Sequence, residues 1–149
     1  MAVMLKLPKR MEEALLAVYG DGKRESEVAK ELGVSKQAVS KFVREGRARL
    51  TEIFLEVTEV LHADLVRINL SKGYAIIKPR QLRVKAYVFY VPGSGPRVLF
   101  EGDIRCSEEA RTLCREVVKA VKAWGLIKAC SGVDDEEGII RCVIKLLEE

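Results

Sequence analysis

Apolar residues recur every three or four positions over the first sixty residues of this chain, which is the period of an α-helix. The spacing predicts a first helix over residues 9–19 and a second over residues 25–32. A third helix begins after Ser35 and continues to about Leu61, because no strong turn signal interrupts it. Gly46 is the one weak point that we expect in this long helix.

At Ala63 the pattern changes to short apolar runs separated by glycine-containing turns, which predicts β-strands. Four of these runs are expected to form two hairpins, 65–70 with 74–77 and 82–91 with 97–100. Ser107 then caps a helix that extends to Trp124. Two further short runs, 126–130 and 139–147, are interpreted as strands, although the second would also tolerate a helix.

Residues 25–44, ESEVAKELGVSKQAVSKFVR, have the spacing of two short helices packed across each other. Ala29 is a small residue where the two backbones come close, and Gly33 suits the left-handed conformation that ends the first helix. The inward positions are all apolar: Val28, Leu32, Val34, Val39 and Phe42. This arrangement is that of a helix-turn-helix.

The second helix of the motif presents a polar and basic outer face. A glutamine there can pair with an adenine edge, and lysines can reach guanine acceptors or phosphates. The two arginines further along the helix are expected to point toward the DNA backbone. The candidate DNA-binding residues are Ser35, which also caps the helix, Lys36, Gln37, Ser40, Lys41, Arg44 and Arg47. The alternative is a helical hairpin with a solvated polar face.

The segment VAKELGVSKQAVSKFVREGRARL, within about residues 10–50, resembles the helix-turn-helix of many bacterial and archaeal transcription regulators. The continuation RARL is most similar to the sigma-factor region-four and archaeal Tfx-like versions. The resemblance implies binding to double-stranded DNA. It does not indicate an operator or a ligand.

These elements predict an α+β protein with three parts. Residues 1–46 form a three-helix helix-turn-helix head, and residues 47–62 form a connecting helix. Residues 63–149 form an antiparallel sheet with one packed helix, which serves dimerisation or effector binding.

The connecting helix carries a strong apolar stripe. Val43, Leu50 and Val57 take one heptad position, with Ile53 and Val60 at the other. The stripe could pair two copies of the chain or pack against the chain's own C-terminal half. We favour a homodimer, because heads of this kind usually bind paired half-sites.

Charge is distributed unevenly along the 149 residues, whose net charge is +4. Residues 51–66 contain four acids and no base, whereas residues 67–100 contain seven bases and no acid. This alternation fits a protein that presents one face to a polyanion, or it is ordinary solvated surface charge.

Motifs for catalysis or metal binding are absent from the sequence. The four cysteines form no CxxC pair, so we expect small apolar core residues, with disulfides as the alternative. His62 is the single histidine and is interpreted as a helix-end residue. We therefore expect no enzymatic activity, no cofactor and no metal. Without an apolar run long enough to cross a membrane, the protein is expected to be cytoplasmic. Its charge-rich composition favours a thermophilic source, and the resemblance to Tfx-like heads implies an archaeal one.

The sequence as a whole predicts a sequence-specific DNA-binding transcription regulator. One alternative is a protein-interaction adaptor of the transcription machinery with weak DNA contact. Another is a regulator that senses an unknown small-molecule effector. In that case aromatic residues of the C-terminal part would line a pocket rather than fill a core: Tyr87, Phe89, Tyr90, Phe100 and Trp124.

Overall fold

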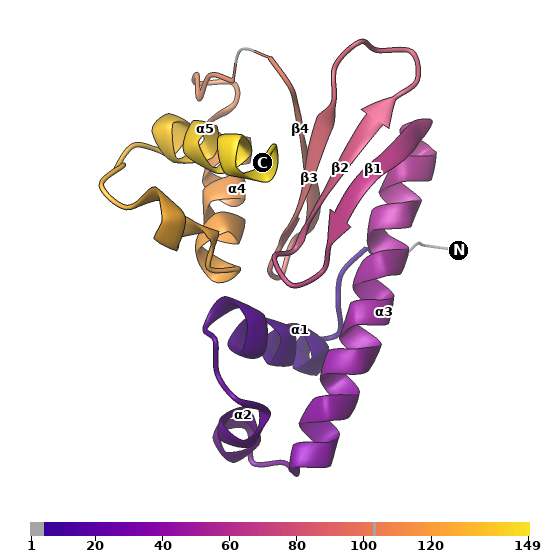
Figure 1. Cartoon of the computed structure of the whole chain (residues 1–149), viewed down its shortest axis with the longest axis vertical. Helices are drawn as coiled ribbons and strands as arrows, with labels where there is room; N and C mark the ends of the chain where they lie inside the picture. The colour runs from indigo at the N-terminus through magenta and orange to yellow at the C-terminus, as the bar shows by residue number, and fades with distance from the viewer. Residues whose placement is uncertain (1–4, 103) are drawn as a thin grey trace.

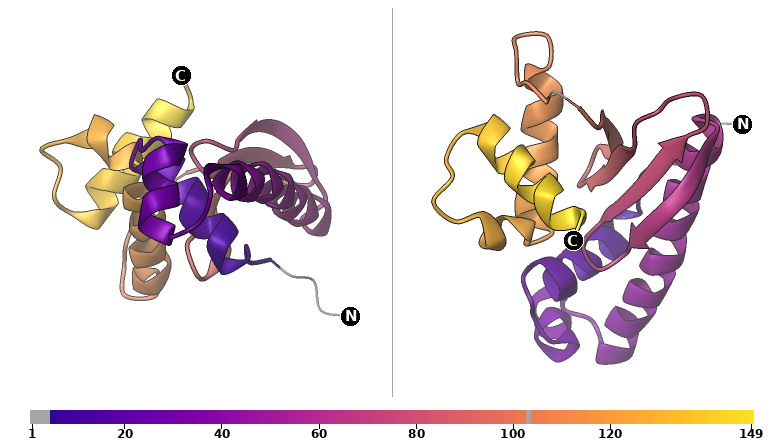
Figure 2. Two further views of the ribbon diagram at one scale, coloured as in Figure 1. Left: turned by 90° about the horizontal axis from the view of Figure 1, so that it is seen from below. Right: turned by 45° about the horizontal axis from the view of Figure 1, so that its top comes forward.

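Helices cover both faces of a four-stranded antiparallel sheet (Figures 1 and 2). The structure is a computed structural model that describes residues 5–102 and 104–149. Residues 1–4, where the predicted head begins, and residue 103 lie outside this description. The α+β class is confirmed.

The N-terminal region is helical, as predicted. It contains α1 (Lys9–Leu15), which continues as a π-helical turn η1 (Leu16–Gly20), then α2 (Glu25–Leu32) and α3 (Lys36–Val60). The predicted first helix therefore divides into two elements that differ in hydrogen bonding. The α3 helix is unbroken over 25 residues, about 37 Å, and connects the motif directly to the sheet.

Gly46 is a buried contact between α3 and α1, and the helix is unbroken there. A Cβ atom at this position would lie 3.0 Å from Leu15 Cδ1, a tighter approach than packed side chains normally make. The missing side chain therefore allows α1 to pack closely against α3.

The apolar stripe of α3 packs against the chain's own core. Leu50 and Phe54 have no exposed surface, and Ile53 and Val57 are also buried. The interpretation of this stripe as a coiled-coil seam between two copies is wrong. The alternative, packing within the chain, is confirmed, and only Val60 at its end is exposed.

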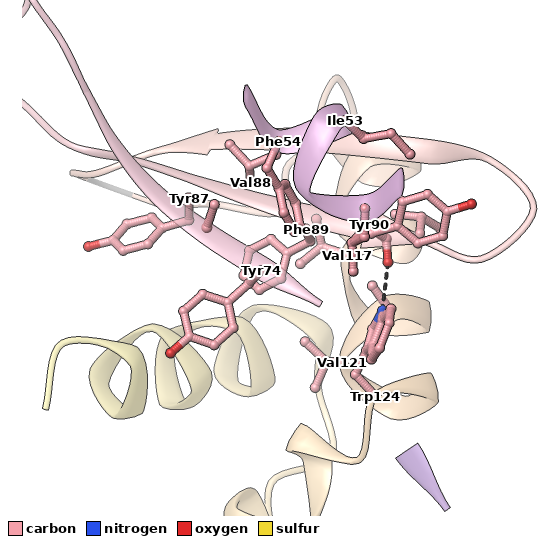
Figure 3. Packing of buried hydrophobic residues seen from close by; sticks show 14 of the residues in the cluster. Ile53, Phe54, Tyr74, Tyr87, Val88, Phe89, Tyr90, Val117, Val121 and Trp124 are labelled. Atoms are coloured by element: carbon pink, nitrogen blue, oxygen red, sulfur yellow. Dashed lines mark hydrogen bonds between the residues drawn. The ribbon is translucent and has the colours of Figure 1, made fainter. Parts of the chain in front are cut away.

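The sheet is formed by the two predicted hairpins. Its strands are β1 (Ala63–Asn69), β2 (Tyr74–Pro79), β3 (Ala86–Val91) and β4 (Gly95–Phe100), in the order β1-β2-β3-β4. Strand β3 begins four residues later than predicted and is buried along its whole length. It is covered by α3 on one face and by the C-terminal helices on the other (Figure 3).

The C-terminal part contains more helix than the sequence pattern predicts. It consists of α4 (Arg111–Ala123), a 3-10 helix η2 (Leu126–Cys130) and α5 (Glu136–Leu147). The strands predicted at 126–130 and 139–147 are helical instead, so the prediction of two strands here is wrong. The prediction of a single packed helix is also wrong. In α5 the Asp135 carboxylate accepts a hydrogen bond from Gly138 N and caps the helix, and its buried residues follow helical spacing. The predicted Ser107 cap is also wrong, because residues 107–110 form a turn before α4.

All four cysteines form disulfides, which overturns the expectation of apolar core residues. Cys106 pairs with Cys114 and ties the preceding loop to α4. Cys130 pairs with Cys142 and ties η2 to α5. Both bridges therefore hold the C-terminal helices together.

Trp124, directly after α4, joins these helices to the sheet and the N-terminal region (Figure 3). Its indole Nε1 donates a hydrogen bond of 2.9 Å to the Tyr90 carbonyl oxygen. The ring lies where a side chain on Gly73 would be, so a Cβ there would overlap it. Similarly, a Cβ on Gly20 would overlap the carbonyl oxygen of Ala123.

The Tyr90 hydroxyl connects β3 to the segment around α1. It accepts a hydrogen bond from Leu7 N and donates one to Glu12, each 2.7 Å long. Gly93 N also donates to Glu12, at 3.0 Å. Burial raises the pKa of Tyr90, so the hydroxyl keeps its proton and continues to donate.

We expect Gly73→Ala to lower the free energy of unfolding more than Gly22→Ala does. Both glycines have a φ near +70°, so both variants carry a backbone cost of about 1–2 kcal/mol. Only the alanine at Gly73 meets Trp124, which adds about 1–3 kcal/mol, whereas nothing lies near Gly22. Urea unfolding of both variants checks this, and equal losses would show that the indole does not occupy this position.

Reduction of the disulfides is expected to destabilise the protein by about 2–3 kcal/mol for each bridge, because they close loops of 8 and 12 residues. Urea unfolding with and without reductant measures the loss. A variant with alanine at all four cysteines is the control, since it should not respond to reductant. Four free thiols in the denatured, unreduced protein would contradict the pairing.

Candidate nucleic-acid interface

The turn between α2 and α3 has the conformation that the motif predicts. Gly33 ends α2 with a left-handed backbone, φ +68°. Ser35 begins α3, and its hydroxyl accepts a hydrogen bond of 3.1 Å from Ala38 N. Val28 and Val39 are buried between the helices. The two helices are thus fixed across each other by local backbone chemistry and a small shared core.

Five of the seven candidate residues lie together on one side of the first turns of α3. They line one shallow depression: Lys36, Gln37, Ser40, Lys41 and Arg44. Viewed from below, α2 and the start of α3 face the reader (Figure 2). Within the described part of the chain, Lys36, Gln37 and Arg44 have no hydrogen-bond or ion-pair partner, and Lys41 has only a 4.0 Å contact with Glu45. Their polar groups are therefore available to a ligand.

Both candidate serines take part in hydrogen bonds within the motif. Ser35 is occupied as the cap of α3. The Ser40 hydroxyl donates a hydrogen bond of 2.6 Å to the carboxylate of Glu25 at the start of α2. This bond fixes the crossing of the two helices, and nothing in the separate patterns of α2 and α3 indicates it.

Arg47 lies apart from the other candidates. Its guanidinium donates a 3.1 Å hydrogen bond to the Tyr19 hydroxyl and stacks over that ring, 5.4 Å from the centroid. A longer contact of 3.4 Å reaches Ser71 in the turn after β1. The structure thus places Arg47 against η1 and the turn after β1, and its side chain does not line the depression formed by the other candidates.

The basic segment 67–100 uses much of its charge within the chain. Arg67 donates a 2.8 Å hydrogen bond to the Leu147 carbonyl oxygen, and Arg97 forms a 2.6 Å ion pair with Glu116. Further pairs join Lys85 to Glu148 and Arg80 to Asp64. Hydrogen bonds from Tyr87 and from Lys85 lower the pKa of Glu148. The contacts of Arg67, Lys85 and Arg97 hold the C-terminal helices against the sheet, whereas the Arg80–Asp64 pair joins β1 to the end of β2.

Near the motif, two further cations are paired with α2. The Lys23 ammonium donates a 3.0 Å hydrogen bond to Glu31, which raises the pKa of Lys23. Arg24 lies 3.8 Å from Glu27. Among the described residues, the cations of the motif without a partner are Lys36 and Arg44 on the start of α3 and Lys30 on α2.

The five aromatic residues considered for a small-molecule pocket do not gather around one cavity, since Tyr87 and Phe100 line two separate hollows. Phe89, Tyr90 and Trp124 are core residues with almost no exposed surface. A separate open groove of about 840 Å³ lies between α5 and the ends of β3 and β4. Its lining residues include Tyr87, Glu101, Ile104, Ile144 and Lys145. Within residues 5–102 and 104–149, no cluster of His, Cys, Asp or Glu has the arrangement of a metal site, and no helix could span a membrane.

Comparison with known proteins agrees with this geometry. The family model for sigma-70, region 4, matches residues 1–50, about a third of the chain. The N-terminal region is therefore similar to a helix-turn-helix DNA-binding domain of that kind. No curated protein and no solved structure matches the chain.

Among the arginines of α3, we expect Arg44 to be a DNA contact and Arg47 to be a structural residue. Arg44→Ala should weaken DNA binding and reduce the slope of log K against log salt by about 0.9, with stability unchanged, because one phosphate contact is lost. Arg47→Ala should leave that slope unchanged and lower the free energy of unfolding by about 1–2 kcal/mol. Anisotropy titrations and urea unfolding measure both quantities. An exchange of the two phenotypes would contradict the assignment.

Proposed function

We propose that this protein is a sequence-specific transcription regulator that binds double-stranded DNA as a homodimer. The observation that carries the proposal is the group of five side chains on the exposed start of α3: Lys36, Gln37, Ser40, Lys41 and Arg44. They belong to the region similar to sigma-70 region 4. The proposed architecture is a reading head, a connecting helix and a C-terminal part that positions the head.

In this proposal the start of α3 enters the major groove, which is wide enough for one helix. Gln37 reads an adenine through its amide, which can donate and accept at once. Lys36 and Lys41 contact guanine acceptors or phosphates, and Arg44 contacts the DNA backbone. Ser35 and Ser40 keep the helix in register through their bonds to Ala38 N and Glu25.

The continuity of α3 couples the reader to the rest of the chain. The same helix begins at the DNA-binding face and ends against β1. Its buried stripe leaves no room for a shift relative to the sheet unless the core repacks. A change in the position of the sheet would therefore also rotate the DNA-binding start of α3. This supports a regulator in which pairing of the C-terminal parts of two chains sets the distance between their two DNA-binding helices.

Effector sensing is a second candidate function, supported by the groove between α5 and the sheet. The groove is as large as ordinary small-molecule sites and combines apolar walls with a tyrosine hydroxyl and charged groups. Thermal unfolding against a metabolite panel tests this role. A rise in the midpoint that Ile144→Trp removes would support it, and a flat response would reject it.

The DNA-reading role predicts a large effect of the triple variant Lys36→Ala, Gln37→Ala, Lys41→Ala. We expect duplex binding to weaken about a hundredfold, near 3 kcal/mol, because two cations and one bidentate amide are lost. The probe is a duplex selected by the wild-type protein from random sequences, and the readout is fluorescence anisotropy. Lys119→Ala with Lys122→Ala is the matched control, since it removes two lysines from an exposed face of α4.

Equal binding by the triple variant and the wild type would show that these residues do not read DNA. Salt dependence separates the regulator from a protein-interaction adaptor. Binding that neutralises phosphates should fall by about 0.9 in log K per contact for each log unit of salt, whereas an apolar protein interface should barely respond. A shallow slope would favour the adaptor.

A further inference from the structure

Large apolar side chains are exposed at one end of the molecule. Within the described residues, six are exposed: Leu55, Val60, Leu65, Val66, Leu82 and Phe100. Four of them lie on the last two turns of α3 and the first half of β1. We call these six residues the distal surface, because they begin at Leu55, eleven residues or about 16 Å along α3 from Arg44 of the DNA-reading face. This end is at the top of Figure 1.

Two adjoining hollows make this surface uneven. One is lined by Leu55, Glu59 and Arg80, among others, and the second by Leu61, Leu82 and Phe100. His62 borders both. Apolar side chains with recesses between them can interlock with a partner, whereas a flat solvated surface cannot. Exposed apolar residues that gather in this way mark interaction sites more often than isolated ones do.

The charges around the distal surface are complementary to one another. The outer side of α3 carries Glu52, Glu56 and Glu59, none of which has an ion-pair partner among the described residues. Lys78 and Arg83 lie on β2 and the loop after it, exposed and likewise without a partner. A surface with adjacent acidic and basic regions can pair with a copy of itself about a two-fold axis, because each region then meets its opposite.

Strand β1 adds an open sheet edge. It lies at the end of the strand order, pairs only with β2 and is exposed over its middle residues. Leu65 and Val66 are exposed on this edge between the charged Asp64 and Arg67, next to a β-bulge. Apolar exposure and unpaired backbone groups thus occur on the same strand.

We propose that the distal surface is the interface through which two copies of this chain pair. This inference rests on the homodimer of the proposed function and assigns its contact region. The stripe of α3 that the sequence offers for pairing is buried within one chain, which leaves the outer side of its last turns and β1 as the exposed apolar surface at this end. Pairing here leaves the start of α3 free at the opposite end of each copy.

Sedimentation of the full-length protein over a wide concentration range tests the interface. The wild type should form dimers. Val60→Glu should weaken dimerisation at least about tenfold, or 1.4 kcal/mol, because a charge would be buried without a partner. Leu82→Glu, in a different element, should act in the same direction. Both side chains are exposed, at 69% and 45%, so the thermal midpoint of the monomer should not change.

Lys119→Glu is the matched control, since it places the same acid on an exposed helical position outside the distal surface and should leave dimerisation unchanged. A wild type that stays monomeric at every concentration would overturn the inference, as would dimers that tolerate both glutamate variants. Duplex binding is measured on the same samples. A monomer that binds DNA would overturn the interface and the homodimer but keep the DNA-reading function, whereas a dimer that does not bind DNA would overturn only the DNA-reading function.

Discussion

The indole of Trp124 is the contact on which the arrangement of the whole chain depends. It occupies space that exists only because Gly73 has no side chain, and its N–H satisfies the backbone of Tyr90 at the centre of the sheet. At the neighbouring end of α4, Gly20 allows the backbone of η1 to approach closely. Three segments far apart in the sequence therefore meet at one point. Because tightly packed interiors do not deform gradually, the C-terminal helices, the sheet and the N-terminal region move together or not at all.

This packing decides what α3 can do. A helix has one apolar stripe, and α3 uses Leu50, Ile53 and Phe54 of that stripe to cover its own sheet. The same residues cannot also join a second chain without exposing the sheet to water, which would cost several times the roughly 1.5–3 kcal/mol of each large side chain. Any pairing of subunits must therefore use surface left outside the core. The surfaces that remain for pairing at this end are the last turns of α3 and the open edge of β1.

The sequence predicts the features that depend on neighbouring residues. Gly33 and Ser35 set the turn of the motif because a left-handed residue and a helix cap are local requirements, and the glycine turns place both hairpins. Features that depend on residues far apart in the sequence cannot be predicted from local patterns. The β-branched run after Gly138 favours a strand, yet the cap and the cover of α4 make it a helix. Arg47 belongs to the predicted basic face by spacing, but Tyr19 captures it.

Electrostatics explains why one reader alone would hold DNA weakly. Most of the sequence's densest basic segment is not available, because residues such as Arg67 and Arg97 are paired within the chain. What remains at the reading face is a small set of cations, namely Lys36, Lys41 and Arg44. Binding free energy from phosphate neutralisation grows with the number of contacts, and three give a modest salt slope. In a rigid dimer the two DNA-binding helices together make twice as many phosphate contacts, although neither N-terminal head gains a contact. The small number of free cations at each reading face is thus itself an argument for a paired protein.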